Sequence, residues 1–466
     1  MNIPLIIAVL AAKFASFISR QFGWKGSSLP GVVALKIYQG TLSDLAGQAR
    51  RGVVMVTGTN GKTTTNNMIA NVIEAGGFKA VINQEGANLI TGVTAAFIKH
   101  ADWLGRIEAD YALLEVDEAS FPRVVKEIKP QLVVVNNFFR DQLDRYGELD
   151  KTVHLVRDAL KTLPKVRLVL NTDDPLVAQM QSTTGHPASF FGLAPNQRPE
   201  TGAKQTREAR FCPHCGRELQ YDTYQYSQLG SFNCENCGFK RQSPEIEAQD
   251  VKILGTALRC QVKYPAGEVQ LTIYTQGFYN LYNALAAFTV GYLVGIEPQQ
   301  ILAGLLRYKP AIGRMETFRH NGKPAILNLV KNPTGYNEGV ETLLSIPGTK
   351  NIFMAVNDND ADGRDISWLW DVDFEHLAVN HQEMVLFVCS GLRGEEMALR
   401  LKYAGVPLEK ITVIREMEAA IPEALAGPGE STWLFSTYTA LWPAQKILSG
   451  LAVKEDLHAE GLSSVS

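Results

Sequence analysis

The sequence predicts an α/β protein with two successive parallel sheets, the first of which carries a phosphate-binding loop and an inserted four-cysteine segment. Three observations lead to this prediction. Short apolar, β-rich runs alternate with helix-like segments along most of the chain. A glycine-rich loop at residues 57–64 follows one of the first runs. Two Cys-x-x-Cys pairs lie in a segment that interrupts the alternation.

The bulk composition limits the class of protein. With 466 residues, the chain is too long for one ordinary core, and two or three domains are expected. Hydrophobic residues make up 45% and charged residues 20%, as in soluble globular proteins. The formal charge of -3 argues against a general nucleic-acid binder. Six cysteines in such a chain are not a disulfide framework, so we expect a reducing, cytoplasmic setting.

The N-terminal segment, residues 1–50, begins with the apolar run MNIPLIIAVL, which Lys13 ends. This run is shorter than the roughly 20 residues that span a bilayer. It resembles a signal-peptide core, but no charged residue precedes it and no clear cleavage site follows. We expect an apolar helix that packs on the protein or touches a membrane surface, with a true membrane anchor as the alternative.

The first series of β-rich runs belongs to a central domain expected at residues 51–312. Its candidate strands are residues 53–56, 111–116, 132–136 and 166–171. Each run ends in polar residues and precedes a helix-like segment, which is the pattern of βαβ units in a buried parallel sheet.

The second series predicts a C-terminal Rossmann-like α/β domain at residues 313–466. Its candidate strands are residues 325–329, 352–356, 384–389, 411–414 and 432–435, and residues 394–404 are a candidate helix between them.

The strongest chemical signal is TGTNGKTT, between the strand-like RGVVMV and a helix-like segment. Its glycines let the backbone curl and aim N–H groups at phosphate oxygens, and the following helix adds its positive end. Lys62 can reach the β- and γ-phosphates, and the Thr63 hydroxyl is the natural magnesium ligand. The first glycine of the usual pattern is Val56 here, so a plain glycine-rich turn is the alternative. The expected ATP-binding residues are Gly58, Thr59, Asn60, Gly61, Lys62, Thr63 and Thr64.

Such a loop also needs an acid on a neighbouring strand to share the magnesium ion. Glu115 ends the run YALLE, and Asp117 and Glu118 follow it. Because ligands bind at the carboxyl ends of parallel strands, we expect Glu115 to be this ligand. A solvated acidic turn is the alternative.

The segment at residues 196–245 is rich in Gln, Arg, Pro and Gly and reads as a surface insertion. Two CxxC pairs separated by 18 residues, each followed by glycine, predict a zinc ribbon at about residues 205–243. Four thiolates close the tetrahedral shell of Zn²⁺, so a structural role is expected, with free thiols as the alternative. Zinc ribbons can bind nucleic acid, but the absence of a wider basic surface argues against this role here. The expected ligands are Cys212, Cys215, Cys234 and Cys237.

Several motifs together resemble the Mur ligase family. TGTNGKTT, LLEVDEAS, NNFFRDQLDRYGELD and NTDDP are similar to its central domain, and GRMETF at residues 313–318 to its junction with the C-terminal domain. GFYNLYNALAA at residues 277–287 is similar to its adenine-side helix start. The resemblance, from about residue 50 to the end, implies ATP and Mg²⁺ as cofactors. It places Asn280 and Asn283 beside the adenine and Arg314 near the phosphates; helix N-capping is another reading of the asparagines.

Within this family, the chain is most similar to the synthetase subunits that amidate lipid II. The four-cysteine insertion, the segment NDNDADGRDISWLWDVDFE at residues 357–375 and the lack of room for a UDP-sugar domain before the phosphate loop carry this resemblance. It implies that ATP phosphorylates the α-carboxylate of D-isoglutamate in the lipid II stem peptide. Ammonia then attacks the acyl phosphate to give D-isoglutamine, a step of peptidoglycan synthesis.

The same resemblance implies a partner, a class I glutaminase of the GatD type, which supplies the ammonia. In the family, an aspartate of the C-terminal domain completes the partner's Cys–His dyad. The candidates are Asp358, Asp360, Asp362 and Asp365, of which Asp362 is favoured and Asp358 is second; a polar loop is the alternative. Lipid II as substrate implies contact with the inner face of the cytoplasmic membrane, through the substrate or the N-terminus. Cys260 and Cys389 read as core residues.

The chain departs from the family at two positions. Gln142 stands where ordinary Mur ligases carry a histidine, and Arg157 stands near the place of a carbamylated lysine. In the family, both residues are linked to a second magnesium ion. Whether this chain binds a second magnesium ion is therefore left open by the sequence. An ordinary Mur or folylpolyglutamate-type ligase that adds an amino acid, and a zinc-ribbon ATPase scaffold, are the alternative functions.

Overall fold

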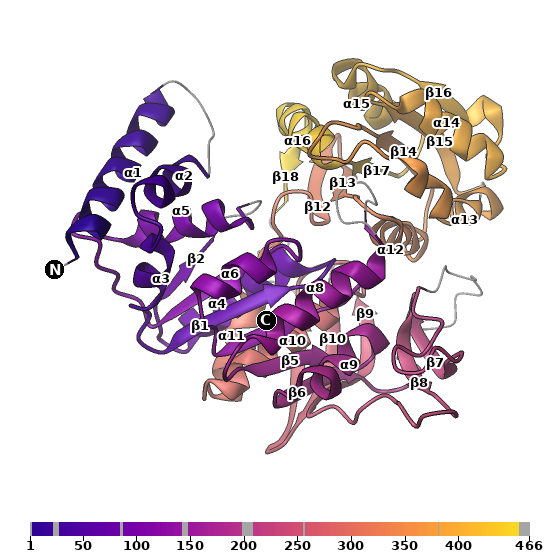
Figure 1. Ribbon diagram of the computed structural model, residues 1–466. Coiled ribbons are helices and arrows are strands. Elements are labelled where there is room, and N and C mark those ends of the chain that lie inside the picture. The colour runs from indigo at the N-terminus through magenta and orange to yellow at the C-terminus, as the bar shows by residue number, and fades with distance from the viewer. Residues whose placement is uncertain are drawn as a thin grey trace.

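The computed structural model has an N-terminal helical layer, a central nine-stranded sheet with a small hairpin beside it, and a seven-stranded sheet (Figure 1). It describes residues 2–21, 28–83, 87–141, 148–197, 208–254, 257–380 and 382–455. The prediction of an α/β protein with two mainly parallel sheets is confirmed.

The N-terminal layer consists of α1 (Ile3–Gln21), α2 (Leu29–Ile37) and α3 (Thr41–Ala46). The helix α1 continues past Lys13, where the apolar run was expected to end, and packs on α2 and α5 (Ile90–His100). The helices α2 and α5 approach closely, because a Cβ atom at Gly31 would lie 1.8 Å from the carbonyl oxygen of Thr91. Within the described ranges, no helix combines the length and the apolar character needed to cross a membrane.

The central sheet has the strand order β11-β10-β9-β6-β5-β4-β1-β3-β2. All neighbours from β2 to β9 are parallel, whereas β10 pairs antiparallel with β9 and β11. The sequence predicted β1, β3, β4 and β5 to within a residue or so, but not the other strands. The strands are β1 (Gly52–Thr57), β2 (Ala80–Ile82), β3 (Tyr111–Glu115), β4 (Leu132–Val135), β5 (Arg167–Asn171), β6 (Ala188–Leu193), β9 (Ile246–Leu254), β10 (Ala257–Tyr264) and β11 (Gly267–Ile273).

Both faces of this sheet are covered, which explains why its central strands are apolar throughout. Val53 and Met55 of β1 pack in one core, with α5, α6 (Phe121–Glu127), α8 (Leu149–Lys161) and α9 (Pro175–Thr184). Val54 and Val56 point to the other face, with α4 (Lys62–Ala75), α10 (Asn280–Leu293) and α11 (Pro298–Leu306).

The second sheet has the order β16-β15-β14-β17-β13-β12-β18, with β12 and β18 antiparallel to their neighbours. The five strands predicted here are present; β12 and β18 were not predicted. The strands are β12 (Glu316–His320), β13 (Lys323–Leu329), β14 (Lys350–Ala355), β15 (Met384–Ser390), β16 (Ile411–Val413), β17 (Ser431–Ser436) and β18 (Val453–Lys454). The helices are α12 (Pro333–Leu344), α13 (Glu375–Val379), α14 (Gly394–Tyr403), α15 (Met417–Ala426) and α16 (Tyr438–Leu451), with short 3₁₀ turns at Ser367–Asp371 and Leu408–Lys410.

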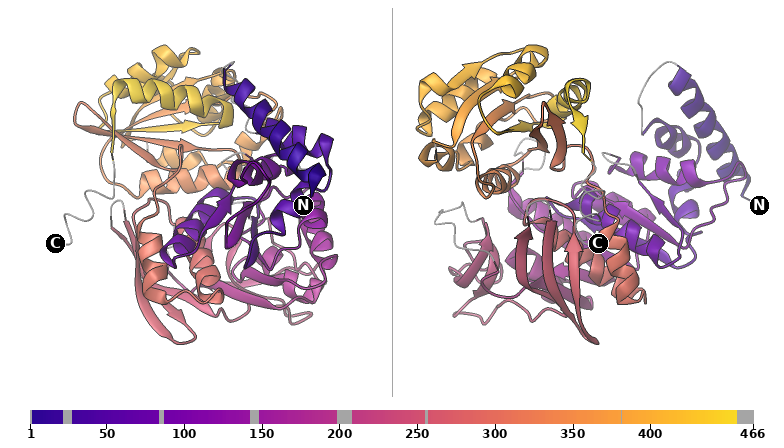
Figure 2. Two further views of the ribbon diagram at one scale, coloured as in Figure 1. Left: turned by 90° about the vertical axis from the view of Figure 1, so that its left-hand side faces the viewer. Right: turned by 180° about the vertical axis from the view of Figure 1, so that it is seen from behind.

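The inserted segment forms the hairpin of β7 (Gln220–Tyr226) and β8 (Leu229–Asn233) between β6 and β9. In all three views, the N-terminal helices and the seven-stranded sheet rise from the same side of the central sheet (Figures 1 and 2). This is the side of the phosphate loop, because Asn60 and Asn332, at the start of α12, are hydrogen-bonded to each other.

Candidate active site

The phosphate loop runs from the end of β1 to the start of α4 and needs glycine at two positions. Gly58 has a φ angle of 121°, and a Cβ atom there would lie 2.8 Å from the carbonyl oxygen of Asn137. Gly61 has a φ angle of 81°, and its Cβ would lie 2.2 Å from Asn283 Oδ1. The segment after β4 fixes the position of the loop, since the N–H of Asn60 donates to Asn137 Oδ1 at 2.8 Å.

Replacement of Gly61 by alanine is expected to weaken ATP binding by about tenfold or more, because the methyl group displaces Asn283 from the loop and strains the backbone at positive φ. Gly77→Ala is the matched control: Gly77 has nearly the same φ angle, 82°, but nothing within 4 Å of its Cβ position. Calorimetric titration with ATP measures the effect. Equal affinity losses in both variants would trace the effect to backbone strain and not to the loop.

Lys62 is buried, and its ammonium group donates to Glu118 Oε2 at 3.0 Å and to the Gly58 carbonyl oxygen at 2.6 Å. Burial alone would lower the pKa of Lys62, but the carboxylates of Glu118, Asp117 and Glu115 outweigh burial and raise it. The side chain is therefore charged at neutral pH. The sequence did not single out Glu118 as the partner of this lysine.

Thr63 and Glu115, the two residues expected to hold magnesium, lie side by side. The Thr63 hydroxyl donates to Glu115 Oε2 at 2.7 Å, and both side chains are buried. A hydroxyl and a carboxylate oxygen are hard donors of the kind that Mg²⁺ takes together with phosphate oxygens. The donor set therefore fits a magnesium ion.

Asn280 and Asn283 join α10 to the helix of the phosphate loop. Asn283 accepts a hydrogen bond from the Thr65 hydroxyl at 3.1 Å and donates to Asn280 Oδ1 at 3.0 Å. Asn280 in turn donates to the Gln276 carbonyl oxygen at 2.6 Å. The alternative reading of these asparagines as N-caps is wrong, because the cap residue is Tyr279 and no side chain caps the helix.

A cleft opens between the phosphate loop and the second sheet. Arg314 lines it, and its Nε atom is buried without a hydrogen-bond partner among the described residues. An unpaired buried donor on a cationic group is costly unless an acceptor reaches it. The cleft thus fits an anionic ligand such as a nucleotide. Its walls also include Asn60, Gly61, Thr64, Tyr226, Tyr279, Asn283, Lys331 and Asn332.

Lys331 and Asn332 bring the C-terminal part of the chain to the loop. Lys331 Nζ donates to the Thr59 carbonyl oxygen at 3.2 Å and pairs with Asp141 Oδ2 at 3.0 Å. Asn332 donates to Asn60 Oδ1 at 3.0 Å. Sequence reasoning missed both residues, although the polar KNP directly after the apolar run of β13 is the kind of strand-end signal that marked Glu115.

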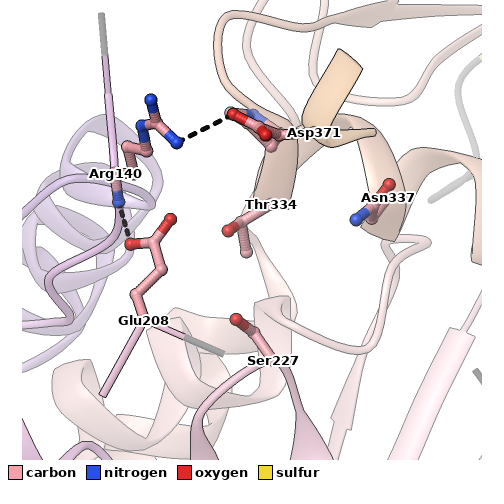
Figure 3. Close-up of a pocket in the computed structure, with 7 residues that line it drawn as sticks. Arg140, Glu208, Ser227, Thr334, Asn337 and Asp371 are labelled. Carbon is pink, nitrogen blue, oxygen red and sulfur yellow. Dashed lines mark hydrogen bonds and ion pairs between the residues drawn. The ribbon is translucent and has the colours of Figure 1, made fainter. Parts of the chain in front are cut away.

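A second, smaller pocket adjoins this cleft and shares Thr334 with it (Figure 3). Arg140 bridges its two sides: the guanidinium pairs with Asp371 at 2.9 Å and the backbone N–H donates to Glu208. Burial raises the pKa of Glu208 to about 7, although its contact with Arg140 acts in the opposite direction.

The four cysteines of the insertion converge, with ligand atoms all within 4.8 Å of one another. The Sγ atoms of Cys212 and Cys237 are 3.6 Å apart, and those of Cys215 and Cys234 are 3.5 Å apart. Disulfide bonds are far shorter, at about 2 Å. A tetrahedral zinc ion with Zn–S bonds of about 2.3 Å implies sulfur separations of roughly 3.8 Å. The cluster therefore fits a zinc ion.

The hairpin between the two cysteine pairs reaches the nucleotide cleft. Tyr226, at the end of β7, packs against Phe139 and against Tyr282 of α10, with ring centroids 6.0 and 5.8 Å apart. Asp173 anchors the base of the insertion: it accepts from Arg241 at 2.6 Å and from the Tyr282 hydroxyl at 2.8 Å.

Asp174, the second aspartate of the NTDDP motif, has a local structural role. Its carboxylate caps α9 by accepting from the N–H of Leu176 at 2.9 Å, and it also accepts from the N–H of Phe138 at 2.9 Å. Burial raises its pKa to about 7.

The aspartates proposed to serve the glutaminase lie in the turn after β14, at a distance in sequence from the loop. Asp362 is only 3% exposed and accepts from the N–H of Thr439 at 2.7 Å; burial raises its pKa. Asp358 pairs with Arg393 at 2.6 Å. Asp360 has a 90% exposed side chain and pairs with Arg364, whereas Asp365 accepts from the N–H of Ser367 at 2.8 Å.

The remaining residues of the sequence analysis fall outside this site. Cys260 and Cys389 are buried, and burial raises the pKa of each to about 12, as expected of core thiols. Arg157 lies on α8 and pairs with Asp158 at 2.9 Å. Gln142 lies outside the described residues.

Comparison with known proteins gives the same picture as this geometry. Residues 56–239 match the family model of the Mur ligase middle domain, and residues 329–441 match that of the MurT ligase C-terminal region. Among solved structures, a pseudomurein peptide ligase type C from Methanothermus fervidus superposes with a TM-score of 0.68 at 23% identity, over 87% of this chain and 80% of its own. MurF ligase from Thermotoga maritima, in complex with ADP, superposes with a TM-score of 0.62 at 14% identity, over 89% of this chain and 83% of its own. The fold and the phosphate loop define a Mur ligase.

Similar proteins narrow the class further. The chain is 37% identical to the lipid II isoglutaminyl synthase (glutamine-hydrolyzing) subunit MurT of Staphylococcus aureus, over 94% of this chain and 96% of that protein. It is 33% identical to the subunit of the same name from Streptococcus pneumoniae, over 96% and 98%. The chain belongs to the MurT family of Mur ligases, which confirms the resemblance seen in its motifs.

Proposed function

We propose that the chain is the synthetase subunit of a glutamine-dependent amidotransferase that converts D-isoglutamate of the lipid II stem peptide to D-isoglutamine. The observation that carries the proposal is the similarity over nearly the whole length to two MurT subunits, whose names state this activity. The cleft beside the phosphate loop, which Arg314 and Lys331 line, supports it.

In this reaction, a carboxylate oxygen of the acceptor attacks the terminal phosphorus of ATP, and ADP leaves. The acyl phosphate that forms is then attacked by ammonia; phosphate leaves, and the amide nitrogen gives up a proton. Lys62 and the loop N–H groups bind the phosphates, and Arg314 offers its free Nε donor to them. Thr63 and Glu115 would hold Mg²⁺, which neutralises phosphate charge.

The ion pair between Lys62 and Glu118 suggests how Lys62 stays charged and in position before a nucleotide binds. A lysine buried without a counter-charge would lose its proton or destabilise the loop, and Glu118 prevents both. When the β- and γ-phosphates enter, they take over as the counter-charge. We propose that Glu118 is a positioning residue of the empty site and that Glu115 remains with the metal.

We further propose that Zn²⁺ occupies the four-cysteine cluster in a structural role. The knuckles have matching hydrogen bonds: the N–H of Cys212 donates to the Arg217 carbonyl oxygen and that of Cys234 to the Phe239 carbonyl oxygen, each at 2.7 Å. Such repeated turns preorganise thiolates around one ion.

Cys212→Ser is expected to lose the zinc ion and to lower the melting temperature by about 5 °C or more, because the proposed metal would no longer join the two knuckles. His214→Ala is the matched control, since His214 lies inside the same knuckle but is not among the four convergent ligands. Metal analysis and thermal melting measure both. Normal melting together with full zinc content in Cys212→Ser would contradict the proposal.

The partner is proposed to be a GatD-type glutaminase that binds the C-terminal α/β domain and forms a heterodimer with this chain in the cytoplasm. The division of the chain at about residues 50 and 312 assigns ATP binding to the central domain and partner binding to the C-terminal domain. The Asp358–Asp365 turn, with Asp362 favoured, would supply the carboxylate that orients the histidine of the partner.

Co-expression with such a glutaminase and mass spectrometry of the lipid II product tests the whole proposal. Amidation lowers the product mass by about one unit, since –OH becomes –NH₂. The second candidate, a ligase that adds an amino acid, would instead add an amino-acid residue to the product and need no glutaminase. Departures at Gln142 and Arg157 from the pattern of ordinary Mur ligases argue against that candidate. ATP turnover that needs no peptidoglycan precursor would favour the other alternative, a zinc-ribbon ATPase that acts as a scaffold.

A further inference from the structure

The helix α1 carries two apolar faces on opposite sides. One face packs on the protein through residues that recur every three or four positions. These are Leu5, Ala8, Val9 and Ala12, of which none is more than 5% exposed. Residues at this spacing share one side of a helix, so this side of α1 packs against α2 and α5.

The opposite face of α1 is exposed and apolar as well. Its members are Ile3, Ile7, Leu10, Phe14, Phe17 and Ile18, with exposed fractions between 41% and 65%. At 100° per residue, they form one stripe centred about 180° away from the buried set. A helix that faces water normally carries polar residues there. Single exposed apolar residues are ordinary, but a continuous stripe marks a binding surface.

The loop after α5 extends this stripe. Trp103 and Leu104 are 66% and 44% exposed. The loop is tied to the helical layer, because the side chain of Gln48 donates to the Gly105 carbonyl oxygen at 2.9 Å and Lys13 Nζ lies 5.5 Å from the centre of the Trp103 ring. We call the six residues of α1 with Trp103 and Leu104 the α1 stripe.

Charge distinguishes the possible occupants of the α1 stripe. The first acidic residue of the chain is Asp44, whereas the preceding 43 residues contain four basic ones, Lys13, Arg20, Lys25 and Lys36. Asp102, next to Trp103, offsets part of the charge of Lys13 and leaves a positive excess. A second copy of the chain would bring the same positive charge and be repelled. An anionic bilayer attracts it, and a tryptophan and two phenylalanines beside lysine are typical of the headgroup interface.

We propose that the α1 stripe binds the surface of an anionic phospholipid bilayer, with α1 lying along the headgroup region and its opposite face held by the protein. The benefit to catalysis rests on the proposed function: an enzyme that acts on a lipid-linked peptide gains from being kept at the surface that carries it. The N-terminal helices rise from the same side of the central sheet as the seven-stranded sheet that closes the nucleotide cleft (Figures 1 and 2).

Co-sedimentation of the full chain with vesicles tests this proposal. Vesicles of phosphatidylcholine alone are compared with vesicles that also contain phosphatidylglycerol. The triple variant Ile7→Ser/Phe14→Ser/Phe17→Ser is expected to bind the anionic vesicles at least about tenfold more weakly than the unaltered chain, because three apolar side chains no longer leave water. Its melting temperature and ATP affinity are expected to stay nearly unchanged, since more than half of each of these side chains is exposed and none belongs to the buried core.

The matched control is Val379→Ser/Tyr403→Ser/Leu408→Ser, which removes apolar side chains that are 80%, 67% and 60% exposed on the C-terminal α/β domain. This variant is expected to bind vesicles normally. Equal binding by the stripe variant would overturn the proposal, as would a stripe that mediates self-association in place of vesicle binding. Resistance of bound protein to alkaline carbonate would also overturn it, because α1 would then span the bilayer.

Failure of the proposed function would look different. If the unaltered chain and a glutaminase did not amidate detergent-solubilised lipid II, the enzymatic proposal would fail while vesicle binding could still be observed. A stripe variant that amidates solubilised lipid II normally, but acts about tenfold more slowly on lipid II in vesicles, would support both.

Discussion

Lys62→Ala is expected to reduce ATP turnover by about 10³-fold or more, to the limit of detection, because it removes the phosphate-loop cation proposed to bind the terminal phosphates. ADP release in the presence of lipid II, glutaminase and glutamine measures this loss. Lys161→Ala, at a half-exposed lysine on the far helix α8, is the control and is expected to retain full turnover.

The loss of turnover in Lys62→Ala must also be distinguished from a loss of stability. Lys62 is 7% exposed and paired with the similarly buried Glu118, so Lys62→Ala leaves an uncompensated carboxylate beside the phosphate loop. We therefore expect the single variant to lose stability and the double variant Lys62→Ala/Glu118→Gln to recover most of it. Turnover that returns with stability in the double variant would refute a direct role of Lys62 with phosphate.

Asp362→Asn is expected to lower glutamine-dependent amidation by about 10²- to 10⁴-fold while sparing amidation with free ammonia, because Asp362 is proposed to orient the histidine of the glutaminase partner. Both rates are measured on the complete complex with saturating ATP. Asparagine keeps the size of the side chain and one acceptor for Thr439, so the turn is expected to stay in place. An equal fall in the two rates would show that Asp362 acts on the structure of the domain and not on glutamine hydrolysis.

Asp360→Asn is the informative comparison for that experiment. Asp360 belongs to the same turn, but its carboxylate points to solvent and pairs only with Arg364 among the described residues. If Asp362 serves the glutaminase, Asp360→Asn leaves both rates unchanged. The opposite pattern, with glutamine-dependent activity lost only in Asp360→Asn, would transfer the role to the more accessible carboxylate.

The sequence predicted those parts of the fold and site that depend on local pattern. The apolar runs of β1, β3, β4 and β5 are buried on both faces and therefore read as continuous apolar segments. By contrast, β9 to β11 form the antiparallel edge of the sheet and mix polar with apolar residues, which gave no such signal. The phosphate loop was visible because its glycines are required by positive φ and close approach.

Contacts between distant segments could not be predicted in this way. Nothing local shows that Glu118 and not Asp117 meets Lys62, because that depends on how the backbone turns after β3. Asn60 and Asn332 are 272 positions apart, and their hydrogen bond follows from how the two sheets meet. The burial of Asp362 against Thr439 has the same origin, since 77 positions separate them.

The inserted hairpin has a consequence for how the enzyme responds to its surroundings. Its tip, Tyr226, forms part of the wall of the nucleotide cleft, and its two ends are Cys215 and Cys234, whose sulfurs are 3.5 Å apart. With Zn²⁺ in the cluster as proposed, oxidants or chelators that reach the exposed thiol of Cys215 would release both ends at once. Affinity for the nucleotide would then fall before the central sheet melts, so that oxidative stress or zinc shortage would slow the enzyme through a part of the chain that takes no role in the chemistry.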